Sequence, residues 1–382
     1  MKKKISLVIL FLLSLFLFVS CGKNENPKAQ VEVTDMVGRK VSVKPGEYKK
    51  VVCIGAGALR LYSYVGDLDK LGGVEDIDNE TATGRPVMFD KVARPYFIAG
   101  KEVFNTLPSV GKGGPQAQAA EPEKILGCNP DIVISEYEDV DKANALEATI
   151  KVPVIVVKYG ASGVFDENVK KSITLLGEVF DKASKAKALN DYIANEKSLI
   201  ESRVKNVNVS EQKKVYICGL GNWGTTNHLM TAQNYAPFNV AKINNLVNDL
   251  ANNGIQAIEE EKFVSLSENM DIMILDAAAI KNIKTLSEDK LNMIKNTKAW
   301  KNNEVYLQMA YNAYYTNLEI ALVNTWFNAK VVYPTLFNDI DINAKLNEVT
   351  KAFLGKELAT EINAYPMSFG GYGKVNRGTI FQ

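Results

Sequence analysis

Aromatic and small polar side chains gather after the apolar segments in the second half of the sequence, where they could wall a binding cleft. The set is Trp223, Asn227, His228, Tyr235, Met309, Tyr311, Tyr314 and Tyr315; in the first half, Tyr137, Tyr159 and Lys112 could face them. Flat rings contribute contact area at little cost in rotamer entropy, so such a cleft suits a large planar or chelated ligand. A tyrosinate oxygen would also be a hard ligand for ferric iron. Core packing is the competing role for each of the 16 tyrosines.

Two of these positions carry narrower expectations. Tyr314 and Tyr315 are adjacent at a predicted helix start, so we expect at most one of them to face the cleft. His228 is the only histidine, whereas sites for bare zinc or manganese gather several histidines and carboxylates. We therefore predict no protein-held metal and no cofactor. His228 either contacts a bound complex, as an axial or hydrogen-bonding group, or is an ordinary loop residue.

The longest helical pattern, which must set the geometry of such a cleft, lies at residues 166–204. It contains no proline and one glycine, Gly177, and its leucines and isoleucines recur three to four residues apart. We predict roughly forty residues of helix, with any break near residues 181–184. A long helix between two α/β halves predicts two lobes held at a fixed separation.

Short apolar segments alternate with helical patterns on both sides of this stretch. They lie at residues 50–54, 132–135, 152–157, 214–218, 272–275 and 304–308. Such segments are typical of buried parallel strands, and ligands of these sheets bind beyond the carboxyl ends of the strands. Residues 31–43 alternate, turn and alternate again, which predicts a hairpin. Cys53, Cys128 and Cys218 are expected to be buried free thiols rather than disulfide or metal ligands.

The N-terminus has the pattern of a bacterial lipoprotein signal. Three lysines precede an apolar stretch at residues 5–19, which is short for a membrane span, and the sequence FVSCG follows. Phe18 stands where leucine is usual. We predict a signal peptide at residues 1–21 with Cys21 as the lipidated residue, and a flexible tether at residues 22–30. The alternative is an ordinary secretory signal with a chance cysteine.

Length and composition are those of a globular chain with room for two lobes. The 382 residues are 46% hydrophobic and 23% charged, with a net charge of +1. This balance argues against nucleic acid as a partner, because nucleic-acid binding normally needs a basic stripe. We predict one α/β lobe at residues 31–163, an interlobe helix at 164–186 and a second α/β lobe at 187–382.

Four motifs in order resemble those of one known family. They are TDMVGRKVSV, EPEKILGCNPDIVIS, LLGEVFDKASKAKAL and YNAYYTNLEIALVNTWFNAKVVYPTLF. The chain resembles the solute-binding lipoproteins of ABC importers for iron complexes, haem and corrinoids. The resemblance runs from about residue 33 to residue 347, and the last motif is most similar to the iron-complex branch. It implies two Rossmann-like lobes joined by a single long rigid helix, a class III periplasmic-binding-protein-like and chelatase-like fold.

The resemblance also implies two docking carboxylates. In this family one surface glutamate on each lobe pairs with arginines of the membrane permease. The matching residue of the first lobe is Glu123, eight positions before Asp131. On the second lobe the match is Glu261, ten positions before Asp271, with Glu260 as the alternative. The competing role for each is that of a solvated charge at a helix start.

The function implied is capture of an iron complex, such as a ferric siderophore, and its delivery to an ABC permease and its ATPase. Haem or a corrinoid such as cobalamin is the alternative ligand. The resemblance implies a monomer, anchored by lipid to the outer side of a bacterial membrane, without catalytic residues. A chelatase-like enzyme and a hydrolase using His228 are competing classes, but there is no Gly-x-Ser-x-Gly motif and the export signal argues against an intracellular chelatase. An adhesin or structural lipoprotein has no support beyond export.

Overall fold

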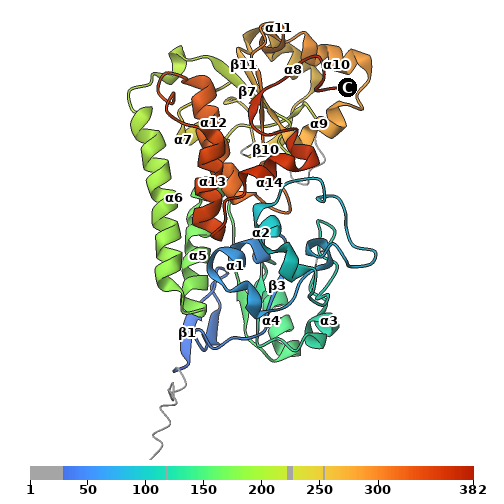
Figure 1. Ribbon diagram of the computed structural model, residues 1–382, viewed down its shortest axis with the longest axis vertical. Helices are drawn as coiled ribbons and strands as arrows, with labels where there is room; N and C mark the ends of the chain where they lie inside the picture. The colour runs from blue at the N-terminus through green and yellow to red at the C-terminus, as the bar shows by residue number, and fades with distance from the viewer. Residues whose placement is uncertain (1–28, 118, 222–226, 253) are drawn as a thin grey trace, which may run out of the picture.

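The computed structural model describes residues 29–117, 119–221, 227–252 and 254–382. The predicted signal, the lipidation residue Cys21 and Trp223 lie outside the described residues. Within them, two α/β lobes are stacked along the long axis of the molecule (Figure 1). The predicted N-terminal hairpin is confirmed, with β1 (Val31–Thr34) antiparallel to β2 (Lys40–Val43). No helix in these ranges is long and apolar enough to cross a membrane.

The first lobe is built on a four-stranded parallel sheet in the order β4–β3–β5–β6. The strands are β3 (Val51–Ile54), β4 (Leu71–Gly73), β5 (Ile132–Ser135) and β6 (Val154–Val156), covered by α1 (Ala58–Val65), α2 (Pro95–Phe104), α3 (Pro122–Gly127) and α4 (Val140–Ile150). Val51 and Cys53 belong to the core on the α1 side, and Val52 and Ile54 to the core on the side of α3 and α4. Burial on both faces explains why these strands are continuously apolar.

The second lobe repeats this plan. Its sheet has the order β9–β7–β11–β12–β13, all parallel except for the edge strand β13. The strands are β7 (Lys214–Cys218), β9 (Asn244–Asn245), β11 (Ile272–Asp276), β12 (Val305–Gln308) and β13 (Gly373–Lys374). Helices α7 (Ala236–Val240) and α12 (Leu318–Val332) cover one face, and α8 (Glu260–Leu266), α9 (Ala277–Ile283), α10 (Glu288–Lys295) and α11 (Lys298–Lys301) cover the other. A two-stranded hairpin, β8 (Met230–Ala232) with β10 (Ile255–Ala257), extends this lobe.

The predicted long helix is two helices. The structure has α5 (Glu167–Val179) and α6 (Ala183–Arg203), which lie side by side because the chain reverses at Asp181 with φ 54°. Gly177 allows this close packing, since a Cβ there would lie 2.5 Å from the Cβ of Ala186. The break lies where it was expected. The interlobe helix predicted at residues 164–186 differs from the structure, because these residues cover α5 and only the start of α6. Helix α6, about 31 Å long at 1.5 Å per residue, is the helix that joins the lobes (Figure 1).

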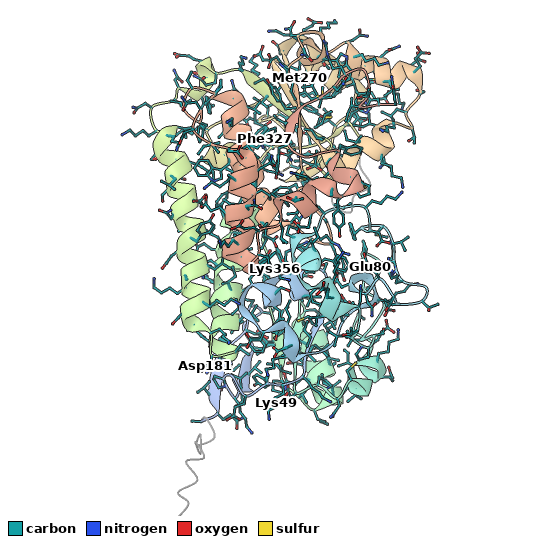
Figure 2. All side chains as sticks on the ribbon, viewed as in Figure 1. Lys49, Glu80, Asp181, Met270, Phe327 and Lys356 are labelled. Atoms are coloured by element: carbon teal, nitrogen blue, oxygen red, sulfur yellow. The ribbon has the colours of Figure 1, made fainter. Side chains whose placement is uncertain are left out.

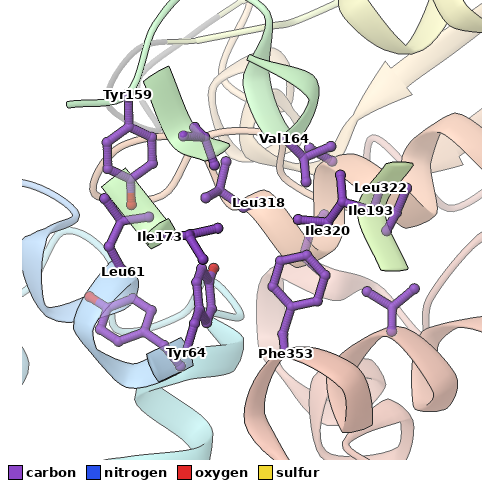
Figure 3. Close-up of a cluster of buried hydrophobic side chains, with 14 of the residues drawn as sticks. Leu61, Tyr64, Tyr159, Val164, Ile173, Ile193, Leu318, Ile320, Leu322 and Phe353 are labelled. Carbon is purple, nitrogen blue, oxygen red and sulfur yellow. The ribbon is translucent and has the colours of Figure 1, made fainter. Parts of the chain in front are cut away.

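The lobes share one continuous core. Figure 3 shows Leu61 and Tyr64 of the first lobe beside Leu318 and Ile320 of α12 and Phe353 of α13 (Ile342–Leu354). The rings of Tyr64 and Phe353 meet edge to face with centroids 5.0 Å apart. The following helix, α14 (Ala359–Ala364), packs on α2. The C-terminal helices therefore return to the first lobe and restrain the relative movement of the two halves.

The carboxyl ends of both sheets face the middle of the molecule. Lys49 lies two residues before β3 and Met270 lies two residues before β11, and the two are toward opposite ends of the molecule in Figure 2. Strands that begin at the far ends must end near the junction of the lobes. The loops that follow β3, β5, β6, β11 and β12 are thereby brought together there.

Candidate functional site

A pocket of about 520 Å³ lies at this junction and is lined by both lobes. The first lobe contributes Ala56, Phe89, Gly114, Pro115, Ala117, Glu136, Tyr137, Gly160 and Ala161; the second contributes Ala232, Asn234, Tyr235, Gly254, Ile255, Tyr311, Asn312, Tyr314, Tyr315 and Thr316. Its volume falls within the roughly 300–1,000 Å³ of small-molecule sites. The pocket is lined mostly by aromatic and small side chains. Glu136 is the one Asp, Glu, Lys, Arg or His among its described lining residues.

Four of the predicted ligand residues line this pocket: Tyr137, Tyr235, Tyr311 and Tyr314. Tyr315 lines it as well, so the expectation that at most one of the adjacent pair faces the cleft is wrong. The reason is the backbone. Tyr314 and Tyr315 both adopt the left-handed conformation, with φ 53° and 71°, and the helix begins only at Leu318.

Two predicted residues are placed elsewhere. Tyr159 belongs to the shared core (Figure 3), where its hydroxyl donates to the Gly57 carbonyl at 3.0 Å and its ring lies 4.3 Å from that of Tyr315. It supports a lining residue without lining the pocket. His228 is 1% exposed and packs against Phe263 of α8, on the other side of the second sheet. Burial lowers the pKa of His228 to about 4, so it is a neutral core residue at neutral pH.

The loop that carries the second-lobe tyrosines is fixed by a buried arginine of the first lobe. Arg60 of α1, fully buried, donates to the carbonyls of Ala313 at 2.6 Å, Thr316 at 2.8 Å and Tyr314 at 3.1 Å. Asn317 adds a bond from its amide to the Ala93 carbonyl at 2.8 Å. One side of the cleft is thus held to the other by charge-assisted hydrogen bonds to backbone.

A second cross-lobe contact joins Tyr314 to Glu75. The tyrosine hydroxyl donates to Glu75 Oε2 at 2.6 Å and accepts from the Gly114 amide at 3.1 Å. Glu75 also accepts from the Gly55 amide at 3.0 Å. Burial raises the pKa of Glu75 to about 7, although both hydrogen bonds oppose the shift.

Two more carboxyls of the cleft region have raised pKa values. Asp276, at the end of β11, accepts from the amides of Ala278 and Tyr311 and from Gln308, and burial raises its pKa to about 7. Burial, followed by repulsion from Glu138 and Glu75, raises the pKa of Glu136 to about 9. Arg60, Glu75, Glu136 and Asp276 were not predicted as site residues from the sequence. The available signals were the positions of the three acids at strand ends and, for Arg60, a charge within an otherwise apolar helix.

The pocket tyrosines are neutral in this setting. Burial raises the pKa of Tyr235, Tyr311 and Tyr314 above its ordinary value. Nor do residues 29–117, 119–221, 227–252 and 254–382 contain any group of three or more His, Cys, Asp or Glu side chains able to hold a metal ion. The cleft therefore offers rings and neutral hydroxyls rather than tyrosinate oxygens.

The two predicted docking glutamates occupy equivalent places. Glu123 is the second residue of α3, which precedes β5, and Glu261 is the second residue of α8, which precedes β11. Both are exposed, and neither forms an ion pair with another described residue. Glu260, the alternative, is paired with Lys290 at 2.5 Å.

The sequence matches the model of the periplasmic binding protein family over residues 51–310, and the chain belongs to that family. Its two lobes and connecting helix are those of class III periplasmic binding proteins of ABC importers, which act outside the cytoplasm.

Individual relatives are distant. The molybdate-binding protein MolA of Haemophilus influenzae is 22% identical over 259 residues, which cover 60% of this chain and 69% of MolA. A periplasmic solute binding protein of Veillonella parvula superposes with a TM-score of 0.67 at 20% identity, covering 88% of this chain and 96% of that one. CeuE of Helicobacter pylori with bound Ni(II) gives a TM-score of 0.59 at 18% identity, covering 85% and 96%. These likenesses establish the fold and leave the ligand open.

Proposed function

We propose that the protein captures an iron complex, a ferric siderophore or related chelate, and delivers it to an ABC permease and its ATPase. The observation that carries this proposal is the pocket of about 520 Å³ walled by tyrosines from both lobes. Neutral hydroxyls and flat rings suit the organic shell of a chelate better than a bare ferric ion. Haem or a corrinoid is the second candidate, favoured by the same rings, although the described lining includes no histidine to act as an axial ligand.

A reversible binder rather than an enzyme is the role this site supports. A hydrolase would need His228 as its base, and His228 lies in the core behind the second sheet with its ring against Phe263. Arg60, Asn317 and Tyr314 join the lobes across the cleft, so ligand exchange proceeds with small relative movement. We further propose lipid anchoring through Cys21 and a monomeric state, as implied by the family resemblance.

Ligand screening on the full chain tests the proposal. Ferric siderophores, haemin, cobalamin, free Fe³⁺ and free Zn²⁺ are titrated while intrinsic fluorescence and melting temperature are followed, since a ligand of the native state raises the melting temperature. We expect saturable binding of an iron chelate without turnover. Changing Tyr311 to Ala should weaken it about tenfold, because a ring lining the pocket is lost. Tyr306→Ala, outside the pocket, is the matched control. The proposal would be contradicted if no iron chelate bound, or if one of them were turned over.

Glu123 and Glu261 are proposed to dock on cationic side chains of the permease. An exposed apolar residue follows each by three positions, Leu126 at 47% and Val264 at 53% exposure. Residues three apart share a helix face, so each lobe presents a carboxylate beside an apolar contact. Such paired charges fix orientation as well as affinity.

Charge reversal tests this docking. We expect Glu123→Arg or Glu261→Arg to reduce cellular uptake of the bound chelate about tenfold, because like charges then face each other. The dissociation constant of the purified chain should not change. Glu167→Arg, at an exposed first-turn position of α5, is the control. Unimpaired uptake in the double variant Glu123→Arg/Glu261→Arg would remove the docking role.

A further inference from the structure

The pocket contains one carboxyl group, which a bound cation would hold in its ionised form. Glu136 lines it and forms no hydrogen bond or ion pair through its side chain with the described residues. No described lining residue is Lys, Arg or His. Residues 118, 222–226 and 253, which lie outside the described ranges, include no Lys, Arg or His in the sequence either. A bound anion would meet a carboxyl here and no basic side chain.

Two basic side chains near the cleft are already engaged. Arg60 is committed to three backbone carbonyls of the loop at residues 313–316. Lys158 pairs with Glu138 at 2.8 Å. The nearby acids that act on Glu136, namely Glu138 and Glu75, repel its charge rather than compensate it.

Aromatic rings supply the rest of the recognition surface. Tyr137 and Phe89 come from the first lobe, and Tyr311, Tyr314 and Tyr315 from the second. The faces of such rings carry negative potential and attract cations within about 6 Å of the ring centre. Tyr311 is only 6% exposed, and its hydroxyl has no hydrogen-bond partner among the described residues although it lines the pocket. An unpartnered hydroxyl on a largely buried residue beside a cavity is available to a ligand atom.

We propose that the ligand carries positive charge, as a cationic chelate or a chelate with a free ammonium group that lies against Glu136 between the tyrosine rings. This inference rests on the proposed function and narrows its substrate class. A cation beside Glu136 favours the ionised form of its carboxyl group. The bound ligand replaces water in a largely aromatic pocket, so the attraction between the cation and the carboxylate is stronger there than in bulk solvent.

The test is a charge series on one skeleton. Iron(III) complexes of a linear trihydroxamate are prepared with a free terminal amine, an acetylated amine and a succinylated amine, which differ by one unit of charge at each step. Isothermal titration with the full chain should show the ammonium form binding about tenfold tighter than the acetylated form, and the succinylated form weakest. Glu136→Gln should abolish the preference for the ammonium form over the acetylated form, whereas Glu138→Gln should preserve it.

A second arm does not depend on chelates. Choline and its uncharged isostere 3,3-dimethylbutan-1-ol are compared for protection of the native fold and for fluorescence change. If no chelate binds but choline is preferred and the preference is lost in Glu136→Gln, the iron-chelate function fails and the cationic site stands. If chelates bind equally whatever their charge, or if the preference survives in Glu136→Gln, the cationic site is overturned and the chelate function stands. Absence of binding in both arms overturns both.

Discussion

Replacing Arg60 with leucine is expected to lower the free energy of unfolding by about 3–5 kcal/mol, because the change leaves several buried polar groups without partners. Arg60 is fully buried and donates to the carbonyls of Ala313, Tyr314 and Thr316 across the lobe junction. The buried carboxyl of Glu319, whose pKa burial raises and Arg60 lowers, would also lose its cation. Urea unfolding followed by circular dichroism measures the effect.

Two comparisons separate this role from a general effect of losing an arginine. Arg203 forms a two-pronged ion pair with Asp339 at 2.6 and 2.8 Å at the surface, so Arg203→Leu should cost only about 1 kcal/mol or less. Arg60→Lys keeps the positive charge but loses the planar guanidinium group with its several N–H donors. The stability of this variant should lie between those of Arg60→Leu and the natural chain. If Arg60→Leu were as stable as Arg203→Leu, the loop would have another support.

The fold was readable from the sequence where one physical effect dominates. Strands β3, β5, β7 and β11 are buried on both faces, so each is a short apolar segment, and the strand ends then locate the cleft. The lining role of Tyr311 and Tyr314 followed from that placement. The chain reversal between α5 and α6 was harder to predict, because residues 180–182 contain neither glycine nor proline and Asp181 adopts a left-handed conformation instead.

The polar groups of the site were hidden by a different effect. Arg60, Glu75 and Asp276 have the residue types of a surface, and only tertiary contacts distant in sequence satisfy them: Arg60 bonds residues more than 250 positions away. His228 shows the converse. It follows a strand, as ligand residues do, but the chain directs it into the core against Phe263. Strand ends locate a cleft, and the orientation of each side chain depends on packing that one sequence does not display.

The stability of the protein is expected to fall as pH rises from 5 to 8, and Glu75 should account for about 2.5 kcal/mol of the fall. Its pKa in the folded chain is about 7, above its ordinary value of 4.5. Between these values the folded state binds a proton that the unfolded state has released. The stabilisation is therefore complete below about pH 4.5 and declines as pH rises through 7.

The variant Glu75→Gln isolates this effect, because glutamine is close in shape to the protonated acid and cannot ionise. The quantity to follow is the free energy of unfolding of the variant minus that of the natural chain. Other groups cancel in this difference, including His228, whose pKa of about 4 makes stability rise with pH below 6.5. We expect the difference to shift in favour of the variant by about 2.5 kcal/mol between pH 5 and pH 8. A flat line for Glu75→Gln would mean that Glu75 does not take up a proton on folding. Ionisation also makes Glu75 a stronger acceptor for the Tyr314 hydroxyl at 2.6 Å across the cleft, so this hydrogen bond offsets part of the cost of burying the charge.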